Sequence, residues 1–154
     1  VYLGIELDKE QCDHARAQIP LQNVFVLQGS FAEIVPRLPD CSIDGFIAIL
    51  PDPCFIDQKK EDQWRPFYRT VYAKLKSPGA FRLVTEITDD LLQPVSQDAF
   101  DLWSVWLAEV FRSIGFIIAD MHEGSPTEYS SRCLDQFRGD PERIRIITVD
   151  LVKP

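Results

Sequence analysis

The fold is decided by the stretch Gly45-Phe46-Ile47-Ala48-Ile49-Leu50-Pro51-Asp52-Pro53-Cys54, in which a continuous apolar run ends in Pro-Asp-Pro. A short apolar run closed by turn residues is typical of a buried strand. Ligands of parallel sheets bind just past the carboxyl ends of such strands. The two prolines fix φ on either side of Asp52 and prevent a helix from starting there. The pattern therefore places Asp52 at the rim of a site, with an ordinary surface turn as the alternative.

Strands and helices alternate along the rest of the chain. Short apolar runs predict strands over residues 1–5, 23–27, 42–50, 80–85, 116–121 and 144–152. Helical spacing or capping residues predict helices over 9–18, 30–38 and 62–76, and a further long helix that Gly115 closes. The segment 122–142 is polar and reads as irregular. This order predicts an α/β fold, with a mostly parallel sheet, helices on both faces and an antiparallel last strand.

Length and composition favour an ordinary globular protein. A chain of 154 residues suggests one domain over 1–154, and 45% hydrophobic with 26% charged residues is usual for such a domain. No apolar run approaches the roughly 20 residues that span a bilayer. The chain opens on the strand-like Val1 to Ile5 rather than on a signal peptide, so we expect a cytoplasmic protein without a membrane segment.

The cysteines argue against two kinds of site. None of them forms a CxxC pair, and the chain has only two histidines; the four cysteines are Cys12, Cys41, Cys54 and Cys133. This spacing disfavours a zinc site and a disulfide framework, and it favours reduced thiols. Cys54 has no histidine nearby in sequence to activate it as a nucleophile. We therefore expect no metal.

The charge distribution is uneven. A net charge of −8 disfavours a general binder of polyanions. Between residues 63 and 85, however, there is no acid, and five basic residues occur there: Arg65, Arg69, Lys74, Lys76 and Arg82. A local basic face is therefore one interpretation of this segment. The alternative for Lys74 and Lys76 is that they complement the dipole in a last helical turn.

Four segments, in matching order, resemble the tRNA (guanine-N7)-methyltransferase family. Tyr2-Leu3-Gly4-Ile5-Glu6 is similar to a strand that ends in an acid in that family, and Leu50-Pro51-Asp52-Pro53 is similar to its Phe-Pro-Asp-Pro-Trp. Pro78-Gly79-Ala80-Phe81-Arg82-Leu83-Val84-Thr85-Glu86 is similar to its Gly-Gly strand ending in Ala-Thr-Asp. Pro126-Thr127-Glu128-Tyr129 is similar to its Thr-x-Tyr/Phe-Glu before the closing strand.

The resemblance implies a Rossmann-like class I methyltransferase fold with S-adenosylmethionine as cofactor and a tRNA as partner. Glu6 would accept hydrogen bonds from both ribose hydroxyls, as acids do at this position in nucleotide-binding α/β folds. Ser30 would lie beside the adenine, where the family has an aspartate. Asp52 would border both the cofactor and the base and would be the catalytic residue. Glu86, Thr127 and Tyr129 would bind the substrate.

The chemistry implied by the resemblance needs positioning more than proton transfer. Guanine N7 has a lone pair and attacks the sulfonium methyl group in line, so positive charge moves onto the purine. A carboxylate beside the N1–H and the exocyclic amine orients the base and stabilises that charge. Asp52, with Glu86 at the neighbouring strand tip, is the candidate.

The chain departs from the family at several places. The loop over 55–62 carries three acids and two lysines where the family is strongly basic, and Cys54 and Ser130 replace a tryptophan and a glutamate. Phosphate contacts supply most nucleic-acid affinity, so tRNA binding should be weakened. The first strand and its glycine-rich loop are also missing, which predicts an N-terminally incomplete domain. A degenerate binding module, or a methyltransferase for a small molecule or protein, therefore stays open, as does the oligomeric state.

Overall fold

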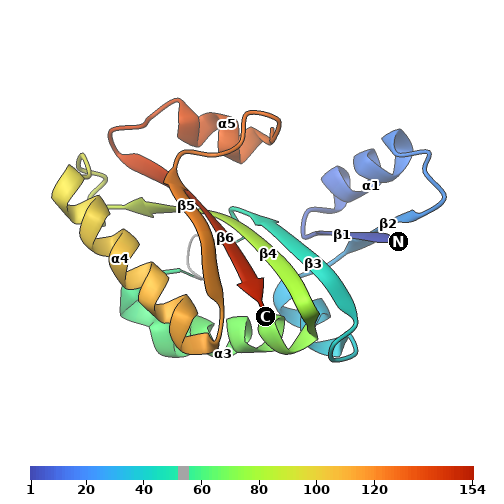
Figure 1. Cartoon of the computed structure of the whole chain (residues 1–154). Coiled ribbons are helices and arrows are strands. Elements are labelled where there is room, and N and C mark those ends of the chain that lie inside the picture. The colour runs from blue at the N-terminus through green and yellow to red at the C-terminus, as the bar shows by residue number, and fades with distance from the viewer. Residues whose placement is uncertain (52–55) are drawn as a thin grey trace. The chain divides into compact units, whose positions relative to one another are not determined.

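The computed structural model describes residues 1–51 and 56–154 (Figure 1). Asp52 and Cys54 are among the four residues outside this description. The chain divides into two compact units, Val1–Pro39 and Asp40–Pro154, and each is described by itself.

The first unit is a two-stranded parallel sheet with one covering helix. It consists of β1 (Tyr2–Glu6), α1 (Lys9–Gln18), β2 (Val24–Gln28), α2 (Phe31–Ile34) and a 3-10 helix (Val35–Arg37). Asp8 caps α1 as its side chain accepts a hydrogen bond from the Gln11 N–H at 2.8 Å. Strand register places Glu6 opposite Gln28, so both strands end together. The predicted strands and the helix over 9–18 are confirmed, and the helix over 30–38 is confirmed as α2 plus the 3-10 turn.

The second unit contains a four-stranded mixed sheet. Its strands are β3 (Ile43–Ile49), β4 (Leu75–Thr88), β5 (Ile117–Glu123) and β6 (Ile144–Lys153), in the order β3-β4-β6-β5. β3 and β4 are parallel, whereas β6 is antiparallel to both β4 and β5. The antiparallel last strand is confirmed. β5 therefore runs in the same direction as β3 and β4, and β6 alone runs against them. The sheet is mixed, so the prediction of a mostly parallel sheet is confirmed in part.

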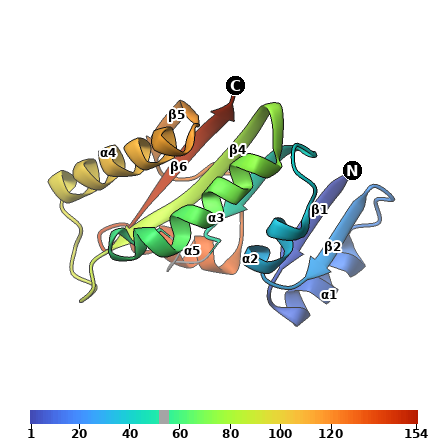
Figure 2. The ribbon, with the colours of Figure 1, turned by 90° about the horizontal axis from the view of Figure 1, so that it is seen from below.

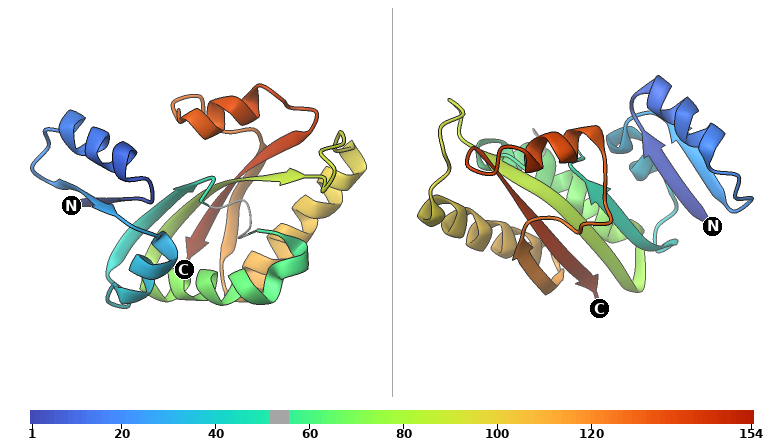
Figure 3. Two further views of the ribbon diagram at one scale, coloured as in Figure 1. Left: turned by 180° about the vertical axis from the view of Figure 1, so that it is seen from behind. Right: turned by 90° about the horizontal axis from the view of Figure 1, so that it is seen from above.

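Helices cover both faces of this sheet. α3 (Glu61–Lys74) and α4 (Gln97–Ile114) lie on one face (Figure 2). Aromatic rings fill the space beneath them, with the Tyr68 and Phe81 centroids 5.9 Å apart and those of Tyr68 and Phe111 5.2 Å apart. Trp64 and Tyr68 are each 1% exposed, so the aromatic stripe of α3 is core. α5 (Arg132–Arg138) lies across the opposite face (Figure 3).

The boundary between α3 and β4 differs from the prediction. Residues 75–79 belong to β4, so Ser77-Pro78-Gly79 does not end the helix and Lys76 lies outside it. Lys153 Nζ of β6 donates to the carbonyl oxygens of Tyr72 at 3.0 Å and Leu75 at 2.8 Å. It thereby satisfies acceptors that the end of a helix leaves open.

The segment predicted as irregular contains α5. Ser131 caps this helix by accepting a hydrogen bond from the Leu134 N–H at 3.1 Å. Leu134 is fully buried against Val84 and Ile146. A helix of seven residues shows too few turns for apolar periodicity to reveal it in the sequence.

Gly115 ends α4 as predicted. Its φ of +121° is accessible mainly to glycine, and a Cβ there would lie 3.0 Å from the Tyr72 ring. Among the helices in the part of the chain that the structure describes, none combines the length and the apolar character needed to cross a membrane.

Candidate functional site

In the first unit, the predicted cofactor residues lie at the ends of two neighbouring strands. The Gly29 N–H, just past β2, donates to the Glu6 carbonyl oxygen at 2.9 Å, so the exit of β2 lies against the tip of β1. Gly29 has φ +151°, and a Cβ at this position would lie 3.1 Å from Ile34 Cδ1. Glycine therefore permits this close turn.

The side chains of Glu6 and Ser30 both have a partner in this turn. Glu6 Oε1 accepts a hydrogen bond from the Asp8 N–H at 2.8 Å, whereas Oε2 accepts none within the described residues. Ser30 Oγ caps α2 by accepting from the Ala32 N–H at 3.2 Å. The unit thus presents a half-buried carboxylate next to a glycine turn, and one of its oxygens accepts no hydrogen bond from residues 1–51 or 56–154.

In the second unit, the chain leaves β3 beside β4. The Leu50 N–H donates to the Val84 carbonyl oxygen at 2.8 Å, and Leu50 has φ +46°. Pro51 is the last described residue before Asp52, which was predicted as the catalytic residue and lies outside the described residues. The end of β3 therefore lies beside Val84, two residues before Glu86 along the neighbouring strand.

Glu86 is only 9% exposed and lies opposite Ile146 of β6. Cys133 of α5 is exposed, but its thiol is partly desolvated. This desolvation first, and then the negative charge of Glu86, raise the pKa of the Cys133 thiol. Val84 packs with Leu134 of α5, and Glu86 follows two residues later on the same face of β4. Glu86 therefore lies on the face that α5 covers rather than on an open rim.

The predicted substrate residues of the closing motif lie on a turn. The Tyr129 N–H donates to the Pro126 carbonyl oxygen at 3.2 Å, which closes the turn, and Thr127 is exposed upon it. Tyr129 is partly buried, and it packs with Leu50 against the cluster that contains Val84. The structure thus brings Tyr129 to the end of β3, where the chain enters the Pro-Asp-Pro turn.

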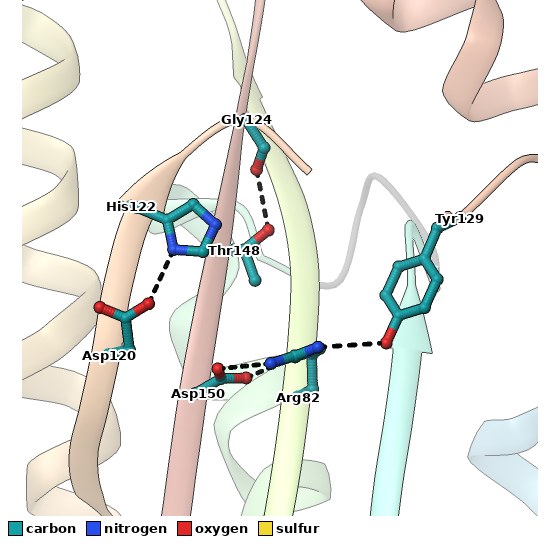
Figure 4. Close-up of polar contacts among 7 residues, drawn as sticks. All are labelled: Arg82, Asp120, His122, Gly124, Tyr129, Thr148 and Asp150. Atoms are coloured by element: carbon teal, nitrogen blue, oxygen red, sulfur yellow. Dashed lines mark hydrogen bonds and ion pairs between the residues drawn. The ribbon is translucent and has the colours of Figure 1, made fainter. Parts of the chain in front are cut away.

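Sequence reasoning missed a polar network on this face of the sheet (Figure 4). Arg82 Nε and Nη2 donate to the two carboxylate oxygens of Asp150 at 2.6 and 2.7 Å, and Nη1 donates to the Tyr129 hydroxyl at 3.4 Å. The hydrogen bond from Arg82 holds the pKa of Asp150 below its ordinary value. Beside this pair, His122 Nδ1 lies 2.9 Å from an Asp120 carboxylate oxygen.

The basic residues between 63 and 85 do not form an uncompensated face. Four of the five pair with carboxylates of this chain: Arg65 with Glu61, Lys74 with Asp40, Lys76 with Asp44 and Arg82 with Asp150. The pairing of Lys76 also replaces the helix-dipole role considered for it. The described lysines of the acidic loop are paired too, Lys59 with Asp90 and Lys60 with Asp57. A polyanion would meet less positive charge here than the sequence indicates.

A hollow of about 280 Å³ lies beside the turn that carries Thr127. Its lining includes Ser125, Phe137, Arg138, Arg145 and Ile146. Within residues 1–51 and 56–154, no group of three or more His, Cys, Asp or Glu side chains is arranged to hold a metal ion.

No protein-family model and no curated protein matches this chain. Several solved structures, in contrast, are similar to it. An antibiotic-related methyltransferase is similar with a TM-score of 0.65 and 19% identity over 99% of this chain and 75% of that chain. An S-adenosylmethionine-dependent methyltransferase from Mesorhizobium loti is similar with a TM-score of 0.62 and 18% identity, over 98% and 80% of the two chains.

A third similar structure has a different activity in its name. The [4+2]-cyclase SpnF has a TM-score of 0.59 and 16% identity over 99% of this chain and 66% of that chain. At such identities the likeness shows the fold alone. The expectation of a class I methyltransferase fold is therefore confirmed in its α/β architecture and in part for the details of the sheet, and this likeness does not identify the reaction.

Proposed function

We propose that this protein is an S-adenosylmethionine-dependent methyltransferase that methylates N7 of a guanine in tRNA. The observation that supports the cofactor most directly is the paired strand tips of the first unit. The free Oε2 of Glu6 is an acceptor for a ribose diol, and the hydrogen bond from Gly29 brings the next strand's exit beside it. The residues present therefore fit the nucleoside half of S-adenosylmethionine.

Each proposed residue has a defined part in the reaction. When bound, S-adenosylmethionine supplies the electrophilic methyl group. Glu6 accepts hydrogen bonds from the ribose, and the turn at Ser30 borders the adenine. Asp52 accepts from the N1–H and the exocyclic amine of guanine, orients N7 for in-line attack and stabilises the positive charge that develops on the purine. Glu86, Thr127 and Tyr129 support the base.

Calorimetry with S-adenosylmethionine tests the cofactor. We expect wild-type protein to bind it and Glu6→Gln to bind at least about tenfold more weakly, because a charged acceptor is replaced by a neutral one. Glu109→Gln makes the same chemical change at an exposed position of α4 and should bind as wild type does. Failure of the wild type to bind, or equal binding by Glu6→Gln, would overturn the cofactor assignment.

Transfer of labelled methyl groups to tRNA tests the substrate. We expect Asp52→Ala to abolish transfer while the protein stays folded, and Asp62→Ala, an exposed acid of α3, to retain it. Transfer that survives near the wild-type rate in Asp52→Ala would refute the role of Asp52. The salt dependence of KM adds a second criterion, because phosphate contacts weaken steeply as salt rises.

The paired basic residues favour one second candidate. A methyltransferase acting on a small molecule or a protein has no need of a basic surface, and four of the five cations between 63 and 85 are paired within the chain. Binding of S-adenosylmethionine without transfer to tRNA, combined with transfer to another nucleophile, would select this candidate.

A further inference from the structure

We propose that Arg82 and Arg138 are positioning residues that fix the substrate turn from two sides through Tyr129. The substrate turn is defined here as residues 125–129. The inference rests on the proposed function in one respect, which is that this turn contacts the substrate. Neither arginine is among the cofactor, catalytic or substrate residues that the sequence predicts.

Arg138 of α5 binds the main chain of the turn at both ends. Its Nη2 donates to the Pro126 carbonyl oxygen at 2.6 Å and its Nη1 to the Tyr129 carbonyl oxygen at 2.8 Å. Its Nε donates to Ser125 Oγ at 3.0 Å, and Nη1 also meets an Asp135 carboxylate oxygen at 3.2 Å. Only the planar guanidinium offers donors in a fixed fork that can meet several acceptors at once.

Arg82 of β4 holds the same tyrosine at its other end. Asp150 binds two nitrogens of Arg82 side by side and thereby orients the guanidinium, and Nη1 points to the Tyr129 hydroxyl (Figure 4). The Tyr129 ring packs between these two contacts against the apolar cluster at Val84. The tyrosine is therefore constrained at its carbonyl, its ring and its hydroxyl.

This arrangement serves positioning because the turn carries Thr127, a proposed substrate residue. Thr127 is exposed, whereas the groups that hold the turn are half-buried. Tyr129 shares its apolar cluster with Leu50, from which the chain continues towards Asp52. A turn that is already ordered loses less conformational entropy when a ligand binds, so its fixation should appear as affinity for the substrate.

Hydrogen exchange tests the fixation without reference to activity. In Arg138→Gln we expect the Tyr129 amide, which donates to Pro126, to exchange about tenfold faster, because the main-chain acceptors lose their charged donor. Arg143→Gln is the matched control, since Arg143 is exposed and forms an ion pair with Asp140, three residues before it, at 3.6 Å. Unchanged exchange in folded Arg138→Gln would overturn the inference.

Kinetics test the consequence for the substrate. Arg138→Gln and Tyr129→Phe should each raise KM for tRNA about tenfold, while kcat and the Kd for S-adenosylmethionine change little. In Arg82→Lys, the lysine keeps a positive charge beside Asp150 but cannot bond Asp150 and the Tyr129 hydroxyl at the same time. We therefore expect Arg82→Lys to raise KM when Tyr129 is present and to cause no further rise when it is combined with Tyr129→Phe.

The outcomes separate the two proposals. Absence of methyl transfer in wild-type protein refutes the proposed function, and the exchange experiment still decides whether the arginines fix the turn. Normal activity in the wild type, together with an unchanged KM in Arg138→Gln or additive effects of Arg82→Lys and Tyr129→Phe, refutes the positioning role and leaves the proposed function standing.

Discussion

The Arg82–Asp150 pair couples the stability of the sheet to pH. The hydrogen bond from Arg82 keeps the pKa of Asp150 below its value in an unfolded chain, which is about 3.9. A lowered carboxyl pKa means that the unfolded state takes up the proton first. The contribution of the carboxylate to stability is therefore complete above about pH 4 and is lost as the pH falls through the folded pKa.

Asp150→Asn should lower the free energy of unfolding by about 1–2 kcal/mol at pH 7, because a partly buried, doubly bonded carboxylate is lost. The difference from the wild type should begin to shrink below about pH 4, where the unfolded chain takes up the proton, and should disappear once the pH falls below the lowered pKa of folded Asp150. Urea denaturation at pH 7, 5 and 3 measures it. Asp44→Asn removes an exposed partner of Lys76 and serves as the control. A difference that stays constant down to pH 3 would show that the charge is not responsible.

The residues found from the sequence differ in kind from those found from the structure. Glu6 and Asp52 stand at the ends of apolar runs, where a local pattern identifies a strand tip. Arg82 and Asp150 lie 68 positions apart in sequence, and their contact depends on the antiparallel register of β4 and β6. Local patterns do not specify that register.

At the level of elements, the long helix α4 was predictable, whereas the short helix α5 and the start of β4 were not. The 18 residues of α4 present a wide apolar face and end at a glycine, so both its type and its end follow from the sequence. α5 is held by a serine cap and one buried leucine, which a polar segment does not reveal. The start of β4 was missed because its residues pair with distant segments, Leu75 with Ile43 of β3 and Gly79 with Lys153 of β6, and a local pattern does not reveal such pairing.

The cap of α4 gives a test at this scale. Ser96 Oγ accepts a hydrogen bond from the Ala99 N–H at 3.2 Å, so Ser96→Ala should lower the free energy of unfolding by about 1 kcal/mol. Ser104→Ala is the control within the same helix. Its hydroxyl donates to the Phe100 carbonyl oxygen at 2.8 Å, and alanine is a good helix former, so its loss should cost less. Equal effects of the two substitutions in chemical denaturation would argue against the cap.

At the scale of the whole molecule, the two units differ in how much apolar surface they bury. Cys12 and Val35 are the only buried apolar residues described in Val1–Pro39, whereas the aromatic core lies in Asp40–Pro154. In the first unit, the apolar side chains of Leu3, Phe25 and Leu27 are between 40% and 54% exposed. A two-stranded sheet with so small a core has little stability of its own.

Native-state hydrogen exchange should therefore show weaker protection for the amides of β1 and β2 than for those of β4 and β6. S-adenosylmethionine at one hundred times its Kd should raise the opening free energy in the first unit by up to about 2.7 kcal/mol, because only the folded unit offers the Glu6 and Gly29 site. The Gly29 amide donates to the Glu6 carbonyl oxygen, so its exchange rate reports most directly on opening of the proposed cofactor site. If S-adenosylmethionine raised the protection of these amides as much in Glu6→Gln as in the wild type, the cofactor would bind elsewhere. If β1 and β2 were as strongly protected as β6 without the cofactor, the small core would not limit their stability.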